Sequence, residues 1–243
     1  MRIVITSPPK TGNKWLKCLL GSIYDLQWIR GDSTPQTNPR QFRTWVESGG
    51  FKDGWIFHQH CRFSRQMVNA IAAAPAETLT IIRDPYDQFV SLFYWLQTRA
   101  VADEARHRVR RGDRPRDILI GKAIDDPAVL ELLAGDFGMY IERANAWLHS
   151  GRSTVFRCEA LHRDPVAALT EGTAQIAPAA PEKIAAAIEN CSVENMRKQS
   201  AKMAQHIRSG KVGDSRQRLG EAHLAVFRQH YADAIRSMGY EVR

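Results

Sequence analysis

Two short segments, far apart in the chain, carry side chains suited to binding phosphate groups. The first segment is residues 9–16, Pro-Lys-Thr-Gly-Asn-Lys-Trp-Leu, and it comes just after a short apolar run at residues 3–5. Residues 83–91, Arg-Asp-Pro-Tyr-Asp-Gln-Phe-Val-Ser, directly follow the apolar run 79–82. Each pattern predicts a strand that ends in a turn and then a helix, which presents backbone N–H groups and a helix N-terminus to an anion. Two such sites predict a nucleotide with phosphates at two ends.

The elements that must position these segments follow an alternating pattern. Strand-type runs occur at residues 2–6, 55–58, 79–82 and 154–157. Helical patterns are expected at residues 14–24, 64–74, 86–96, 129–149, 165–171, 181–189, 193–199 and 219–238. Alternation of this kind predicts an α/β fold, a P-loop-like three-layer α/β/α with a central parallel sheet and phosphate sites at the carboxyl ends of its strands. Residues 31–40 and 110–115 are expected to be loops, and with no clear linker the prediction is a single domain over residues 1–243.

The phosphate segments resemble those of one enzyme family. The first is not a Walker A loop, because G-x-x-x-x-G-K-[ST] does not fit it; it resembles the 5′-phosphosulfate loop of the sulfotransferases, commonly P-K-[ST]-G-T-T-W-L. Residues 83–91 resemble that family's 3′-phosphate motif, R-[ND]-P-x-D-x-x-x-S, and residues 208–214 resemble its R-K-G-x-x-G-D loop. The resemblance implies a sulfuryl donor, 3′-phosphoadenosine 5′-phosphosulfate (PAPS), with 3′-phosphoadenosine 5′-phosphate (PAP) as product and no metal.

The same resemblance assigns roles in the donor site. Lys10 is expected at the bridging and leaving oxygens of the phosphosulfate, and Gly12 permits close backbone approach. Lys14 stands where the family usually has Thr; it either replaces the hydroxyl contact with charge or points to solvent. Arg83 suits a phosphate monoester, whereas Asp87 is most simply a helix N-terminal charge. The full set of expected donor-binding residues is Lys10, Thr11, Gly12, Asn13, Lys14, Trp15, Arg83, Ser91, Cys158, Ser192, Met196, Arg208, Ser209 and Gly210.

The expected adenine pocket departs from the family pattern. By resemblance Trp15 lies against the adenine, but Cys158 stands where a tyrosine is often found. Residues 191–196 resemble the family's T-S-F-x-x-M, with Val193 in place of the aromatic. Base stacking is therefore either weaker here or rests chiefly on Trp15.

Two histidines are candidates for the base that sulfuryl transfer needs to take the acceptor's proton. His58 and His60 stand at the end of the expected strand 55–58. The family places a catalytic His in a K-T-H-like segment at this point. The resemblance therefore implies His60 as the base, with His58 as the second choice.

The acceptor is far less defined by the sequence. Phe93, Tyr94 and Trp95 either receive an apolar ring or belong to the core. An arginine-rich stretch at residues 106–116 leaves room for a glycan or another acidic acceptor. The expected partner is thus a small-molecule or glycan acceptor. The family's K-x-x-x-T-V-x-x-x-E dimer motif is not met, so no oligomeric state is predicted.

Composition leaves two other classes of function open. A P-loop-type kinase shares the strand–loop–helix arrangement, but it needs G-K-[ST], which is missing, and a magnesium-binding acid. A net charge of +8 over 243 residues is also compatible with a non-catalytic binder of nucleic acid or sulfated polymers. The arginine-rich stretch contains no interleaved aromatics for base stacking, so no nucleic acid is expected.

Cysteine use and hydropathy bear on the compartment. The four cysteines are scattered without metal-ligand spacing, and buried, reduced thiols are the expectation. No apolar run approaches the ~20 residues that span a bilayer, and residues 3–5 are too short for the core of a signal peptide. These features predict a cytoplasmic protein that does not bind membranes.

Overall fold

The computed structural model describes residues 1–29, 38–104, 119, 121–207 and 210–243. These residues form two compact units. The first contains residues 1–83 and 143–210, and the second contains residues 84–142 and 211–243. The prediction of a single domain over residues 1–243 stays a prediction.

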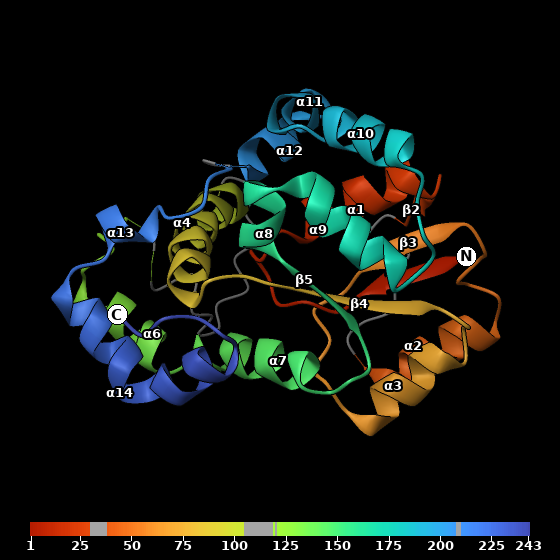
Figure 1. Ribbon diagram of the computed structural model, residues 1–243. Helices are drawn as coiled ribbons and strands as arrows, with labels where there is room; N and C mark the ends of the chain where they lie inside the picture. The colour runs from red at the N-terminus through yellow and green to blue at the C-terminus, as the bar shows by residue number, and fades with distance from the viewer. Residues whose placement is uncertain (30–37, 105–118, 120, 208–209) are drawn as a thin grey trace. The chain divides into compact units, whose positions relative to one another are not determined.

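A five-stranded parallel sheet lies in the first unit, with the strand order β2-β3-β1-β4-β5 (Figure 1). The central parallel sheet expected from the sequence is therefore confirmed. Its strands are β1 (Arg2–Ile5), β2 (Gln27–Trp28), β3 (Trp55–His58), β4 (Glu77–Ile82) and β5 (Thr154–Arg157).

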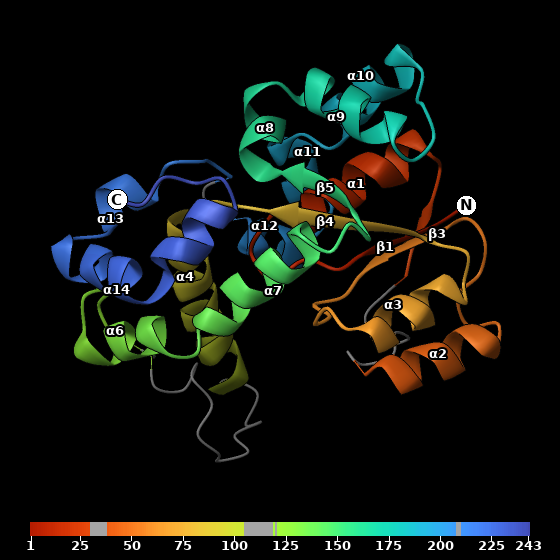
Figure 2. The ribbon, with the colours of Figure 1, turned by 60° about the horizontal axis from the view of Figure 1, so that its bottom comes forward.

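Helices cover both faces of this sheet, because successive side chains of a strand point to opposite faces and here both sets are apolar. Ile3 and Ile5 pack in one core with residues of the helices on their side, and Val4 and Phe57 pack in another with residues of the opposite helices. Figures 1 and 2 show α1, α8, α9 and α10 on one side of the sheet and α2 and α3 on the other. The three-layer α/β/α architecture is thus confirmed. The helices on the first side are α1 (Asn13–Ile23), α8 (Cys158–Arg163), α9 (Pro165–Ala174), α10 (Pro181–Asn190), α11 (Val193–Lys198) and α12 (Ala201–His206), and those on the other are α2 (Pro39–Glu47) and α3 (Arg65–Ala72).

The second unit is helical over its described residues. Phe89, Phe137 and Phe227 form an aromatic cluster in which each pair of ring centroids lies 5.2–6.1 Å apart. All three side chains are buried, so this cluster forms a core of its own. The helices are α4 (Pro85–Glu104), α6 (Pro127–Ala134), α13 (Ser215–Arg218), α14 (Glu221–Ser237) and the start of α7 (Gly138–Leu148), whose end belongs to the first unit.

The expectation of one long helix over residues 129–149 is wrong. The segment forms α6 and α7, which are separated at residues 135–137. The Tyr231 hydroxyl, from α14, lies within hydrogen-bond distance of the carbonyls of Leu133 (2.6 Å) and Ala134 (3.0 Å). These carbonyls belong to the last turn of α6, where no intrahelical donor is available. A distant side chain therefore stabilises the helix end.

The expected loop over residues 31–40 is also wrong at its end. Residues 30–37 lie outside the described residues, but Pro39 already starts α2. The side-chain oxygen of Asn38 accepts from the backbone N–H groups of Arg40 (2.9 Å) and Gln41 (3.3 Å) and so caps the helix. The other expected loop, residues 110–115, lies outside the described residues.

Two of the four cysteines form a disulfide, so the expectation of four reduced thiols is wrong. Cys18 of α1 is bonded to Cys191, which follows α10, across 173 residues of sequence. The packing of the two helices places the Cα atoms 5.8 Å apart, within disulfide range. Cys61 and Cys158 are free thiols and are buried.

Candidate active site

The strand order brings three of the predicted segments to one edge of the sheet. β3, β1 and β4 are neighbours, and Lys10, His60 and Arg83 each follow the carboxyl end of one of them. Two contacts link these segments. Nη1 of Arg83 donates to the Lys10 carbonyl at 3.4 Å, and Nδ1 of His60 lies 2.7 Å from the Ser7 carbonyl. Residues predicted from separate motifs therefore lie together at one edge of the sheet in the first unit.

The loop between β1 and α1 is held in shape by its own side chains. The Thr11 hydroxyl donates to the Pro8 carbonyl at 3.0 Å. The side-chain amide of Asn13 donates to the same carbonyl at 2.7 Å and to the Thr11 hydroxyl oxygen at 3.2 Å. Both side chains are buried. Thr11 and Asn13 were expected to donate to the nucleotide, but in this structure their hydrogen-bond donors maintain the loop.

Gly12 occupies a position that other residues would fill only with strain. Its φ of +107° is in the region that L side chains rarely adopt. A Cβ atom there would lie 3.1 Å from Cδ1 of Ile81 and 3.5 Å from Sγ of Cys158. The loop can pack this closely against β4 and α8 only because residue 12 has no side chain.

The start of α1 is electrostatically suited to an anion. Gly12, the N-cap residue, supplies no side-chain hydrogen bond, and the first turn contains no acidic residue. The first N–H groups of a helix have no intrahelical acceptor and carry a partial positive charge. Lys10 and Lys14 flank this turn and add two positive charges. The residues present therefore fit a phosphate or phosphosulfate group.

His60 is held in the form that a base requires. A carbonyl oxygen only accepts hydrogen bonds, so the contact with Ser7 places the proton on Nδ1 and leaves the lone pair on Nε2. Burial lowers the pKa of His60; the Ser7 hydrogen bond opposes this shift, and the positive charge of Arg143 adds to it. The imidazole is therefore neutral near pH 7. His58, the second candidate, ends β3 with its ring centroid 5.6 Å from that of His60.

The residues expected near the adenine occupy structural positions. Trp15 lies with its ring centroid 4.6 Å from that of His162. Met196 is buried in the core that covers α1, and Cys158 is buried at the start of α8. The Ser192 hydroxyl accepts from the backbone N–H of Asn195 at 3.2 Å and caps α11. Contacts of these side chains with a nucleotide stay predictions.

The remaining predicted residues fall elsewhere. Gly210 ends the first unit with a φ of +64°, and Ser91 lies in α4 of the second unit. Arg208 and Ser209 lie outside the described residues. The structure thus does not test the prediction that Ser91, Arg208, Ser209 and Gly210 bind the donor nucleotide.

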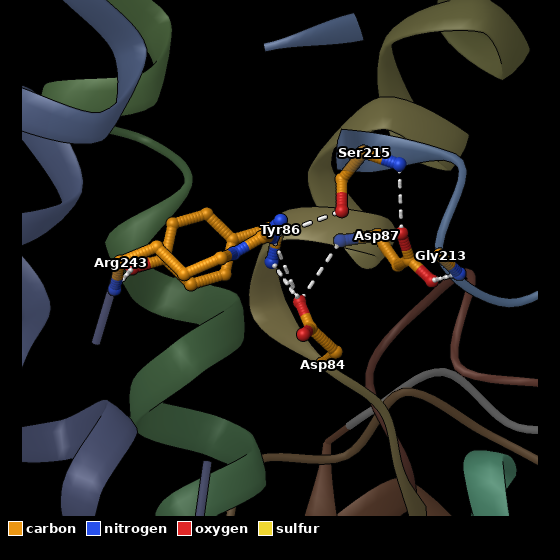
Figure 3. Close-up of polar contacts among 6 residues, drawn as sticks. All are labelled: Asp84, Tyr86, Asp87, Gly213, Ser215 and Arg243. Carbon is orange, nitrogen blue, oxygen red and sulfur yellow. Dashed lines mark hydrogen bonds and ion pairs between the residues drawn. The ribbon is translucent and has the colours of Figure 1, made fainter. Parts of the chain in front are cut away.

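Asp87 has a role that the sequence interpretation missed. Its carboxylate accepts backbone N–H groups of Gly213 (2.6 Å) and Ser215 (2.9 Å), as Figure 3 shows. The sequence indicated only a charge at a helix N-terminus. The sequence did contain a signal for this role, because the family's 3′-phosphate motif specifies an aspartate at the position of Asp87.

Within the residues that the structure describes, no group of His, Cys, Asp and Glu side chains is arranged to hold a metal ion. No helix within those ranges has both the length and the apolar character needed to cross a bilayer.

Comparison with known proteins assigns the family. The model of the sulfotransferase domain family matches residues 1–239. The chain belongs to the sulfotransferase domain family. The similarity extends over almost the whole of this sulfotransferase, as the three motifs indicated. No curated protein sequence matches it significantly.

Solved structures share the fold. Mouse sulfotransferase SULT7A1 complexed with PAP superposes with a TM-score of 0.69 at 18% identity, covering 97% of this chain and 84% of that one. Retinol dehydratase in complex with androsterone and inactive cofactor PAP gives 0.62 at 13% identity, covering 100% and 82%. Retinol dehydratase in a complex with retinol and PAP gives 0.63 at 13% identity, with the same coverage.

Proposed function

We propose that this sulfotransferase moves a sulfuryl group from PAPS to a hydroxyl or amine of an acceptor, with His60 as the base. The observation that carries the proposal is the contact of His60 with Ser7. This contact leaves Nε2 of His60 free of a proton. It also holds the imidazole ring against the loop between β1 and α1, to which Ser7 belongs. Three solved structures of the same fold, of two different proteins, contain PAP, which supports PAPS as the donor.

Each residue of the first-unit site has a distinct role in this proposal. The donor, when bound, supplies an activated sulfuryl group on a phosphate leaving group. Lys10 and the N-terminus of α1 stabilise the negative charge that grows on the leaving oxygen. Arg83 binds the 3′-phosphate. His60 accepts the proton of the acceptor at Nε2 as the new bond to sulfur forms.

The acceptor is proposed to be a small molecule. The two solved structures of retinol dehydratase contain androsterone or retinol, both small molecules. A glycan is the second candidate, on the basis of the arginine-rich stretch at residues 106–116. We also propose a cytoplasmic location for the enzyme, as expected from its sequence.

Thermal unfolding with different nucleotides tests the proposal. PAP should raise the melting temperature, because a ligand that binds the native state stabilises it by mass action. ATP with magnesium should not. His60→Asn should be stabilised by PAP as the wild type is, because His60 need not touch the adenosine. Stabilisation by ATP with magnesium but not by PAP would favour the kinase alternative and contradict the proposal.

A further inference from the structure

Ser7 lies where the chain leaves β1, and its side chain takes the place of a main-chain group there. A ladder bond between β1 and β4 runs from the N–H of Thr6 to the Leu79 carbonyl at 2.9 Å. Further along β4, the N–H of Ile81 donates to the Ser7 hydroxyl oxygen at 2.6 Å. In a regular parallel ladder a backbone carbonyl would accept this bond. The hydroxyl therefore extends the attachment of the chain to β4 beyond the end of β1.

The carbonyl of the same residue is used on the other side of β1, toward the segment that follows β3. A ladder bond there runs from the N–H of Gln59 to the Ile5 carbonyl at 2.9 Å. Beyond it, Nδ1 of His60 donates to the Ser7 carbonyl at 2.7 Å. Ser7 is thus attached on both sides through side chains, its own on the side of β4 and that of His60 on the side of β3.

The surroundings of Ser7 leave its backbone little freedom. Ser7 and Ile81 are both fully buried, so water does not replace the hydroxyl as an acceptor for the Ile81 N–H. Residues 8 and 9 are both prolines, whose rings fix φ and restrict the residue before each of them. The direction of the Ser7 carbonyl therefore depends on where the Ser7 hydroxyl is attached.

We propose that Ser7 is a positioning residue for the base: its hydroxyl, bound to Ile81, directs the Ser7 carbonyl at His60 and so keeps the proton of the neutral imidazole on Nδ1. The inference rests on the proposed function, in which Nε2 of His60 presents its lone pair to the acceptor. Ser7 acts through His60 and not on a reactant. A merely structural role would lower the stability of the fold and leave the proton on the same nitrogen, so the tautomer of His60 is the quantity to measure.

The test is ¹⁵N NMR of the full chain, labelled at histidine, at about pH 8, where an imidazole whose pKa lies below its ordinary value is neutral. The chemical shifts of the two ring nitrogens show which one carries the proton, and His60→Asn identifies the signals of His60. The wild type should carry the proton on Nδ1. In Ser7→Ala the buried N–H of Ile81 loses its acceptor, and the Ser7 peptide loses its anchor. We expect the ratio of the Nδ1–H form to the Nε2–H form to fall roughly tenfold, as the loss of one hydrogen bond predicts.

Thr80→Val is the matched control for this experiment. The Thr80 hydroxyl lies 3.0 Å from the Thr6 hydroxyl, between the same two strands, and both side chains are fully buried. Valine removes the hydroxyl without involving Ser7, so this variant should lower the free energy of unfolding and leave the tautomer ratio unchanged. Ser7→Cys replaces the hydroxyl by a weak hydrogen-bond acceptor. It should also lower the ratio, and it takes the place of Ser7→Ala if that variant does not fold.

The outcomes separate this inference from the proposed function. An unchanged ratio in the Ser7 variants would overturn the inference, and so would an equal fall in Thr80→Val, because general loosening of the sheet would then explain the effect. Calorimetry with PAP tests the proposed function by itself. Ser7→Ala should bind PAP as tightly as the wild type, because Thr11 and Asn13 hold the donor loop through the Pro8 carbonyl. If the wild type binds no PAP, the proposed function fails, and the role of Ser7 in the reaction fails with it even where the tautomer responds.

Discussion

Replacing Gly12 by alanine should destabilise the protein strongly, through two separate effects. The φ of +107° is one that L side chains rarely adopt, and holding an alanine there costs about 1–3 kcal/mol. The added Cβ would also lie 3.1 Å from Cδ1 of Ile81, which is fully buried and has little room to move. Such overpacking costs a further ~1–3 kcal/mol. The sum, about 2–6 kcal/mol, is a large part of the stability of an ordinary domain.

Gly54→Ala is the matched control for this experiment. Gly54 has a φ of +75°, but nothing lies within 4 Å of a Cβ built there, so the variant reports backbone strain alone, about 1–2 kcal/mol. Urea unfolding with linear extrapolation gives both free energies. Gly12→Ala should lose at least ~1 kcal/mol more than Gly54→Ala. Equal losses would refute the reasoning that the loop packs against Ile81 and Cys158.

Three further predictions concern charge, pH and thiols. Lys10→Ala should reduce kcat far more than donor affinity, whereas Arg83→Ala should weaken donor binding roughly ten- to hundredfold. Initial rates at varied PAPS concentration measure kcat and the apparent affinity for the donor in each variant. An unchanged kcat in Lys10→Ala would remove Lys10 from catalysis. Because burial holds the folded-state pKa of His60 below its ordinary 6.5, the unfolded chain binds more protons as the pH falls below 6.5. The wild type should therefore lose more unfolding free energy than His60→Asn between pH 7 and pH 5, by up to about 1.4 kcal/mol per pH unit, and parallel urea curves would contradict this. Thiol titration of the unreduced, denatured protein should detect Cys61 and Cys158 alone, and all four cysteines only after reduction. In the native protein Cys61 should resist alkylation, because burial raises its pKa to about 12.

Local sequence signals were sufficient for four of the five strands, but β2 (Gln27–Trp28) was not predicted. The apolar runs of β1, β3 and β4 are buried on both faces, which produces a pattern that is easily recognised. Parallel strands align their carboxyl ends, so the phosphate segments that contain Lys10 and Arg83 were expected at the same edge of the sheet. Even the missed helix α2 carried a signal, Asn38 followed by Pro39, which is typical of a helix N-terminus.

Features that depend on contacts between distant residues could not be predicted in this way. The break between α6 and α7 is stabilised by Tyr231, and the Cys18–Cys191 disulfide requires that α1 and α10 pack together. The orientation of the Thr11 and Asn13 side chains depends on where the Pro8 carbonyl points. None of these relations leaves a periodicity or a local motif in the sequence.

The central claim, PAPS-dependent transfer with His60 as the base, is tested most directly by one measurement. Wild type, His60→Ala and His58→Ala are incubated with saturating PAPS and a panel of phenols, alcohols, amines and glycans, and sulfated product and PAP are quantified by chromatography. The wild type should produce both in equal amounts. His60→Ala should be slower by roughly 10²–10⁴-fold while still binding PAP, and His58→Ala should lose less. An active His60→Ala with an inactive His58→Ala would reverse the assignment of the base, and transfer by neither the wild type nor the variants would contradict the account as a whole.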